Sequence, residues 1–205
     1  MTGDLKVWLK PGRTALLLID MQFDFADPQG ALGQLGMDME AAQAAVKEAS
    51  TLADAARVAG VPCIFVRLIT HPQSDTPFFK EWKSRRGDDD PALCREGSKG
   101  AEFVGPKPQG GELVFSKTRY NAFHGTGLDA ALRGEGIDTL VVAGLTTECC
   151  IGSSVRAAFE RDYHVFVVED ATACYEPGLH QAALKALALN CARLVTVRDV
   201  AVAWK

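Results

Sequence analysis

The sequence predicts an α/β protein with six parallel strands and helices on both faces of the sheet. Short apolar, β-branched runs alternate with longer amphipathic stretches along the 205 residues, and this pattern is typical of repeated βαβ units. The apolar runs are nearly continuous rather than alternating with polar residues, as expected of parallel strands that are covered on both faces. A chain of this length fits one domain, so we expect a single domain over residues 1–205.

The expected strands are short runs rich in Val, Ile, Leu and Phe, flanked by glycine, proline or polar residues. In chain order they are Ala15–Ile19, Cys63–Leu68, Leu113–Phe115, Thr139–Ala143, Val165–Val168 and Leu194–Val197.

Helices are expected in the stretches between these strands. The longest, Met39–Ala59, is rich in alanine and other strong helix formers, and it is followed by Gly60 and Pro62, which commonly end a helix. The other expected helices are Leu128–Arg133, Glu148–Arg161 and His180–Ala188.

One stretch, Thr70–Gly111, does not follow this alternation. It carries five prolines and the acidic run Asp88–Asp90, and it shows no clear periodicity. Loops of this length are usually lids, interface segments or disordered regions. A solvated loop, a substrate lid and an oligomer contact all stay open, and the aromatic side chains of Phe78, Phe79 and Trp82 favour the last two.

The composition excludes several classes of function. With 22 Lys and Arg against 26 Asp and Glu, the net charge of −4 argues against binding to nucleic acid or to an anionic membrane. No apolar run approaches the roughly 18 residues of a membrane span, and the first residues, MTGDLKVWLKPGRT, lack the apolar core of a signal peptide. The six cysteines contain no C-x-x-C pair and are read as reduced thiols. We therefore expect a cytoplasmic protein.

Groups suited to catalysis follow three of the expected strands. Ligands of open parallel sheets bind beyond the carboxyl ends of the strands, where this chain places Asp20, Lys117 and the pair Cys149 and Cys150. An acid, a base and a thiol at one edge suit nucleophilic acyl transfer. Asp20 follows four aliphatic residues, so burial should raise its pKa and make it a general base. The alternatives are a turn cap for Asp20 and an ordinary surface lysine for Lys117.

The two cysteines are expected to open a helix with Thr147 as its N-cap. The positive end of a helix lowers the pKa of a thiol, and its free N–H groups can hold an oxyanion. The expected core face of this helix is Ile151, Val155, Ala158 and Phe159. Helical spacing turns Cys149 toward charged residues and Cys150 toward small ones, which favours Cys150 as the nucleophile without deciding it. Both could instead be small buried apolar residues.

Three segments together resemble the isochorismatase-like cysteine hydrolases. They are LLLIDMQFDF (16–25), KTRYNAF with the following HGTGLDAALR (117–133), and VVAGLTTECCIGSSVRAAFERDYHVFVVEDA (141–171). The resemblance implies a three-layer α/β/α sandwich with a six-stranded parallel sheet. It also implies an Asp-Lys-Cys triad, which falls on Asp20, Lys117 and Cys150. The family register thus selects Cys150 over its neighbour.

The resemblance also implies how the reacting carbonyl is held. A cis peptide is expected at Leu145–Thr146, with the N–H groups of Thr146 and Cys150 as the oxyanion hole. Four further residues are expected to bind substrate, although core packing is an equally good interpretation of them: Phe25, Tyr120, Asn121 and Phe123.

Departures from the family narrow the expected activity. Nicotinamidases of this family bind a metal through an Asp-x-His motif and a later His, and the corresponding region here, VRLITHPQSD, does not match. Isochorismatases proper lack the cysteine. The RYNAF and GLTTECC segments look most like the ureide-cleaving branch, which includes biuret, triuret, ureidoacrylate and N-carbamoyl amidohydrolases.

We therefore expect a cysteine-dependent amidohydrolase that cleaves a C–N bond of a small linear amide or ureide. A thioester intermediate and ammonia release are expected, with no metal and no organic cofactor. The alternatives are an N-carbamoylsarcosine-type or nicotinamidase-type amidase, a redox protein that uses the Cys149–Cys150 pair, and a non-catalytic binding member of the fold. The expected partners are the small-molecule substrate and further copies of the chain, as a dimer or tetramer, but neither nucleic acid nor membrane.

Overall fold

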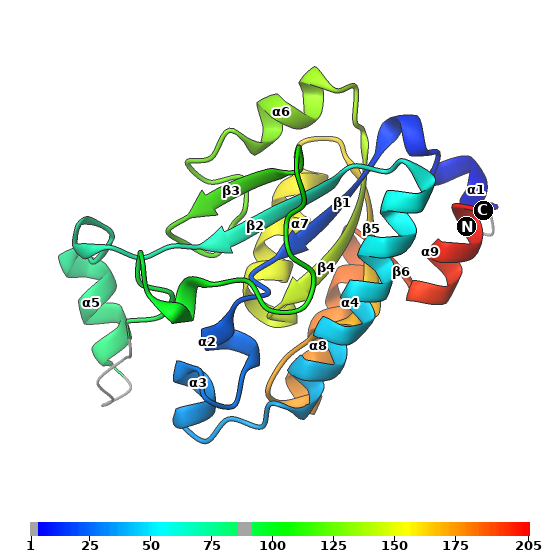
Figure 1. Ribbon diagram of the computed structural model, residues 1–205. Coiled ribbons are helices and arrows are strands. Elements are labelled where there is room, and N and C mark those ends of the chain that lie inside the picture. The colour runs from blue at the N-terminus through cyan, green and yellow to red at the C-terminus, as the bar shows by residue number, and fades with distance from the viewer. Residues whose placement is uncertain (1–3, 86–91) are drawn as a thin grey trace.

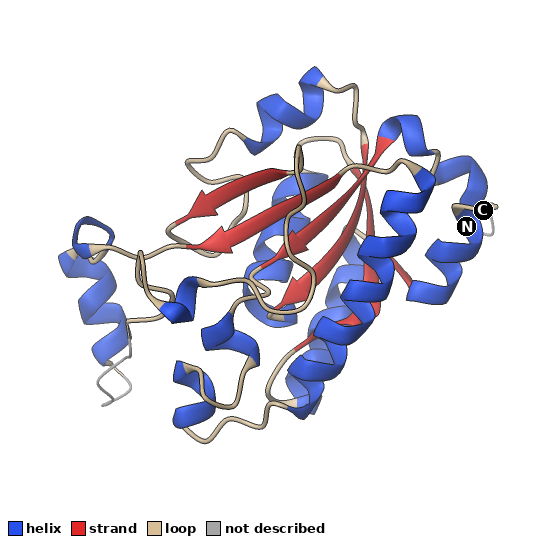
Figure 2. Ribbon diagram, viewed as in Figure 1, coloured by secondary structure: helices blue, strands red, loops and turns tan. Residues whose placement is uncertain are grey.

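A six-stranded sheet, parallel throughout, forms the centre of the protein, as the sequence predicts (Figures 1 and 2). The computed structural model describes residues 4–85 and 92–205. The strands lie in the order β3-β2-β1-β4-β5-β6. Their bounds are β1 Thr14–Ile19, β2 Cys63–Leu68, β3 Leu113–Lys117, β4 Thr139–Leu145, β5 His164–Ala173 and β6 Arg193–Val195.

Helices cover both faces of this sheet and make it the middle layer of three (Figure 1). On one face lie α1 (Leu5–Trp8), α4 (Glu40–Ala59) and α9 (Val197–Ala203), and on the other lie α6 (Leu128–Gly134), α7 (Gly152–Phe159) and α8 (Pro177–Asn190). Three further helices, α2 (Phe23–Ala26), α3 (Ala31–Gln34) and α5 (Pro77–Ser84), belong to the connections beyond the carboxyl ends of β1 and β2.

The two faces of the sheet build two separate apolar cores. In β1, Ala15, Leu17 and Ile19 pack toward α6, α7 and α8, whereas Leu16 and Leu18 pack toward α4 and α9. All five side chains are buried. Burial on both faces is the physical reason for the continuous apolar run in the sequence.

The strand order reverses direction between β1 and β4, which makes this the expected place for a ligand. Gly144 in β4 has φ 134, and a Cβ at that position would lie 2.0 Å from the carbonyl oxygen of Ile19. Only glycine fits such a close approach of two backbones. The approach brings the residues that follow β4 next to the end of β1.

The predicted elements agree with the structure except at their ends and at the sheet edge. Gly60 ends α4 in the left-handed conformation, as predicted. The final strand was predicted too long, because Val197 already begins α9. Edge strand β3 is not covered on both faces, since Leu113 and Val114 are exposed. The prediction that Phe159 lies in the core was wrong, because its side chain is 51% exposed.

The stretch 70–111 has more structure than its sequence suggests. Helix α5 is capped by the Thr76 hydroxyl, which accepts from the N–H of Phe79. Residues 93–104 fold back onto the carboxyl ends of β1 and β2, where Cys94 and Ala101 are buried. The interpretation as a wholly solvated loop is therefore wrong for residues 93–104. Helix α5 is more open to solvent, since its Phe78 side chain is 72% exposed. The acidic run at 88–90 lies outside the described residues, and the roles of lid and oligomer contact stay predictions.

None of the helices in residues 4–85 and 92–205 is both long enough and apolar enough to span a bilayer.

Candidate active site

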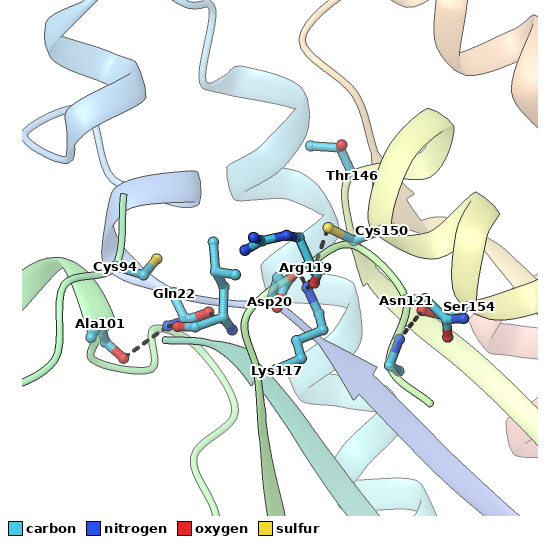
Figure 3. Close-up of polar contacts among 12 residues, drawn as sticks. Asp20, Gln22, Cys94, Ala101, Lys117, Arg119, Asn121, Thr146, Cys150 and Ser154 are labelled. Carbon is cyan, nitrogen blue, oxygen red and sulfur yellow. Dashed lines mark hydrogen bonds and ion pairs between the residues drawn. The ribbon is translucent and has the colours of Figure 1, made fainter. Parts of the chain in front are cut away.

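The three residues predicted as a triad meet at the carboxyl end of the sheet, at the switch between β1 and β4 (Figure 3). The Lys117 ammonium donates to Asp20 Oδ2 over 2.6 Å and lies 3.4 Å from Cys150 Sγ. It also donates to the backbone carbonyl of Arg119 over 3.0 Å. Lys117 thus links the acid and the thiol, and neither a turn cap nor a surface lysine describes these contacts.

Asp20 is held in place by its backbone as well as by Lys117. It directly follows β1, its N–H donates to the carbonyl of Val66 in β2, and it is fully buried. Its φ of 53 lies in the left-handed region, which is uncommon for a residue other than glycine and clusters at functional sites. Within the described residues Oδ1 has no hydrogen-bond partner, so one carboxylate oxygen is available for a proton or a water.

The electrostatics of the site favour a neutral thiol beside a basic carboxylate. Burial raises the pKa of Asp20 above its ordinary value, although the charge of Lys117 opposes this shift. The pKa of the Cys150 thiol is also raised, by its hydrogen bond with Cys149, by burial and by the negative charge of Asp20. Burial alone would lower the pKa of Lys117, but the nearby Asp20 and Cys150 raise it. Lys117 therefore stays an ammonium.

This result corrects the expectation that a helix end lowers the Cys150 pKa. The cysteines lie in a π-helical turn, Thr147–Ile151, that precedes α7, and Cys150 is buried among core residues. The hydrogen bond with Cys149 and desolvation both disfavour the charged thiolate, and here they outweigh a half charge at a helix end. A neutral thiol at this position would have to give its proton to a neighbouring base before it could act as a nucleophile.

The turn that carries Cys150 is fixed by side chains on both sides. The Leu145–Thr146 peptide is cis, as the resemblance implies. The Thr146 hydroxyl donates to Glu148 Oε1 over 2.8 Å. Thr147 is not an N-cap as predicted, because its hydroxyl is hydrogen-bonded to Nδ1 of His180 in α8, also over 2.8 Å. An oxyanion hole formed by the N–H groups of Thr146 and Cys150 stays a prediction.

The four expected substrate-binding residues occupy different environments. Phe123 lies in the core, where its ring packs against Tyr163, so core packing describes it better than a pocket wall. Asn121 Oδ1 accepts from the N–H of Phe123, which ties it into a local turn. Phe25 is buried in α2, and Tyr120 is 42% exposed beside the ring of Phe79. Contact with substrate stays a prediction for Phe25, Tyr120 and the amide nitrogen of Asn121.

Several residues that shape the site were not predicted. The buried Gln22 side chain donates to the carbonyls of Leu68 and Ala101 and accepts from the N–H of Leu68, which joins β1, β2 and the 93–104 segment. Asp24 accepts from the N–H of Cys94 over 2.7 Å. A polar residue between apolar neighbours, as in IDMQFDF, is the signal that could have pointed to Gln22 and Asp24.

In the part of the chain that the structure describes, no group of three or more His, Cys, Asp or Glu side chains is placed to hold a metal ion.

The chain is similar to known proteins in both sequence and overall fold. The isochorismatase domain matches residues 14–199. The chain is 32% identical to the ureidoacrylate amidohydrolase RutB of Methylobacterium radiotolerans, over 86% of this chain and 73% of that protein. A cysteine hydrolase from Pseudomonas syringae pv. phaseolicola superposes with a TM-score of 0.82 at 26% identity, over 95% of this chain and 93% of the other.

Other solved structures with this fold carry different amidase names. N-carbamoylsarcosine amidase from Thermoplasma acidophilum has a TM-score of 0.73 at 28% identity, over 90% of this chain and 96% of the other. The nicotinamidase/pyrazinamidase PncA of Bacillus subtilis has a TM-score of 0.76 at 26% identity, over 89% and 99%. Both of these amidase names denote hydrolysis of an amide C–N bond, and they differ in the substrate.

Proposed function

The chain belongs to the isochorismatase family, and we propose that it is a cysteine-dependent amidohydrolase of small linear ureides, with Asp20, Lys117 and Cys150 as its catalytic residues. The general class of reaction follows from its relatives: the chain is a hydrolase that acts on carbon–nitrogen bonds other than peptide bonds. The main support for these three catalytic residues is the buried Lys117 ammonium, which lies between the Asp20 carboxylate and the Cys150 sulfur.

The first half-reaction forms a thioester. Asp20 takes the thiol proton as the Cys150 sulfur attacks the ureide carbonyl, and the raised pKa of Asp20 suits it to this role. The carbonyl oxygen becomes negatively charged and is held by the N–H groups of Thr146 and Cys150. The C–N bond then breaks, and the departing nitrogen takes the proton from Asp20.

The second half-reaction restores the enzyme. Asp20, again a carboxylate, removes a proton from a water that attacks the thioester carbonyl, and the C–S bond breaks. Cys150 leaves as a sulfur anion and takes the proton back from Asp20. A ureide cleaved in this way gives an amine and carbamate, or ammonia and a carbamate derivative, and the loss of carbon dioxide releases ammonia or amine. Throughout, Lys117 keeps the carboxylate oriented and balances its charge.

The relatives favour a ureide over other amides. The RutB relatives of Methylobacterium and Agrobacterium are named for ureidoacrylate, and both align with 86% of this chain. The nicotinamidase alternative has the weaker support, because the VRLITHPQSD region lacks the Asp-x-His pattern expected of that branch. N-carbamoylsarcosine is itself a ureido compound and falls within the proposed class.

Ammonia release from a panel of amides tests the proposal. We expect turnover of ureidoacrylate, N-carbamoyl amino acids or biuret, no turnover by Cys150→Ala, and little turnover of nicotinamide. Nicotinamide as the best substrate, or full activity of Cys150→Ala, would refute it.

A further inference from the structure

Arg119 lies next to the triad without a carboxylate to balance its charge. Its backbone carbonyl accepts from the Lys117 ammonium over 3.0 Å, so the residue adjoins the reacting groups. Its side chain is half-buried, and in the view of Figure 3 it starts beside the Lys117–Cys150 contact and extends past Asp20, with the guanidinium on the side away from Cys150. Within the described residues, no Asp or Glu lies within ion-pair distance of it.

The side chain of Arg119 is held rigidly by neutral groups. Nη1 donates to the carbonyl of Thr118 over 2.7 Å, and Nη2 donates to the carbonyl of Ser74 over 3.0 Å and to the Thr76 hydroxyl at 3.5 Å. The guanidinium also lies 4.1 Å from the centre of the Phe79 ring. These contacts fix the guanidinium plane but leave its charge unbalanced.

The acidic residue in the segment 74–79, which contacts the Arg119 side chain, already forms an ion pair with another arginine. Asp75 lies between Ser74 and Thr76 and is paired with Arg95, and this contact lowers the pKa of the Asp75 carboxyl. A guanidinium has five N–H donors, and the hydrogen bonds of Arg119 leave Nε–H and one Nη1–H without an acceptor in the described residues. A fixed guanidinium with free donors matches the two oxygens of a carboxylate.

We propose that Arg119 binds a carboxylate of the substrate, so that the preferred substrates are ureido acids with one negative charge rather than neutral ureides such as biuret. This rests on the proposed function, because it assigns the substrate class of the same site. A carboxylate contact would distinguish ureido acids from neutral ureides, a choice that the family resemblance leaves open. The ligand chemistry is a small carboxylate that lies beside the carbonyl to be attacked.

Two substrates of matched length test the proposal: 3-ureidopropionate, which carries a carboxylate, and N-propylurea, which does not. Ammonia release by wild type should favour 3-ureidopropionate. Because a hydrogen bond to a charged group contributes about 1.5–3 kcal/mol, Arg119→Gln should raise KM for 3-ureidopropionate by about 10- to 100-fold. Its rate with N-propylurea should fall by a much smaller factor. Arg119→Lys keeps the charge but not the fork, so it should restore part of the loss.

Arg67 provides a matched control. It too has no ion pair among the described residues, but its Nε donates to Ser116 on β3 rather than to the segment beside the triad. Arg67→Gln should keep the wild-type preference. If Arg119→Gln slows both substrates equally, Arg119 only supports the 74–79 segment and the proposal is wrong. It is also wrong if wild type prefers N-propylurea.

A binding measurement separates this proposal from the proposed function. Calorimetry with 3-ureidopropionate on Cys150→Ala and on Cys150→Ala/Arg119→Gln needs no turnover. Binding that is lost with Arg119 supports the carboxylate site even if wild type releases no ammonia, a result that would refute the ureide hydrolase alone. Equal binding by both variants, or no binding by either, overturns the carboxylate site.

Discussion

Asp20→Asn separates the base from the rest of the triad. An amide has nearly the same size and can still accept the hydrogen bond that Lys117 Nζ donates over 2.6 Å. It cannot take the thiol proton or return one to the departing nitrogen. General acid–base catalysis contributes about 10²–10⁴ in rate, and Asp20 serves both half-reactions, so we expect kcat to fall by about 10⁴.

The cost in stability follows from the burial of the ion pair. The side chains of Asp20 and Lys117 are both at most 1% exposed, and removing one member of a buried pair costs about 3–5 kcal/mol. Asparagine keeps an acceptor, and Lys117 keeps its bond to the carbonyl of Arg119, so the loss should lie near the lower limit. The variant should therefore fold, and urea denaturation compared with Asp20→Ala, which loses the acceptor as well, measures the difference.

Alkylation of Cys150 should respond in the opposite direction to turnover. The negative charge of Asp20 is one cause of the raised Cys150 pKa, and Asp20→Asn removes it while Lys117 remains 3.4 Å from the sulfur. The pH profile of iodoacetamide labelling should thus move to lower pH in a variant that turns over about 10⁴-fold more slowly. Turnover within tenfold of wild type would remove Asp20 from its catalytic role, and labelling that moves to higher pH would contradict the electrostatic reasoning.

Five further outcomes are expected. Cys150→Ala should abolish turnover and keep the fold, whereas Cys149→Ala should keep most activity; exchanged phenotypes in the ammonia assay would place the nucleophile one residue earlier. Prolonged EDTA treatment should leave the rate unchanged, because the sequence lacks the family's metal-binding pattern, and recovery by added zinc or iron after inactivation would contradict this. The acid limb of kcat/KM should lie above the ordinary aspartate pKa of about 3.9, because burial raises the pKa of the catalytic carboxyl. Lys117→Met should be slower than wild type, and its acid limb should lie at higher pH, because the lost positive charge no longer lowers the pKa of Asp20. An acid limb at lower pH would contradict this effect of Lys117. Gly144→Ala should lower the free energy of unfolding in urea by more than about 3 kcal/mol, since its Cβ would lie 2.0 Å from a backbone oxygen. Gly136→Ala, with φ 69 but open space around the Cβ, should lower it by only about 1–2 kcal/mol. Equal losses would mean that β1 and β4 do not approach closely at Gly144.

The fold was predictable because it depends on local signals, and the same signals placed the residues of the proposed triad at the ends of strands. Apolar runs marked the strands, and Asp20 and Lys117 directly end or follow two of them. The choice of Cys150 over Cys149 needed the family resemblance, because helical spacing alone left it open. In the structure a π-helical turn replaces the expected first turn of the helix, so spacing from a regular helix could not have settled the choice.

The remaining features depend on contacts between distant parts of the chain. Gln22 bonds to residues 46 and 79 positions away, and Asp24 bonds to Cys94, 70 positions away, so no periodicity reveals them. The same limit explains the wrong direction for the Cys150 pKa. A helix end can be inferred from sequence, but the burial of the thiol and the proximity of Asp20 are properties of the folded chain.

In the proposed mechanism, the charges of the site give a physical reason for a lysine that transfers no proton itself. In the resting state Lys117 balances Asp20 and Cys150 is neutral, so the buried group has no net charge. When the thiol proton moves to Asp20, the negative charge passes to sulfur, which lies 3.4 Å from the same ammonium. It then moves to the carbonyl oxygen, where N–H groups receive it. A substrate carboxylate would add an unbalanced charge to this buried region unless a second cation lay beside it. Arg119 is such a cation, held by carbonyls and an aromatic ring without an acidic partner in the described residues.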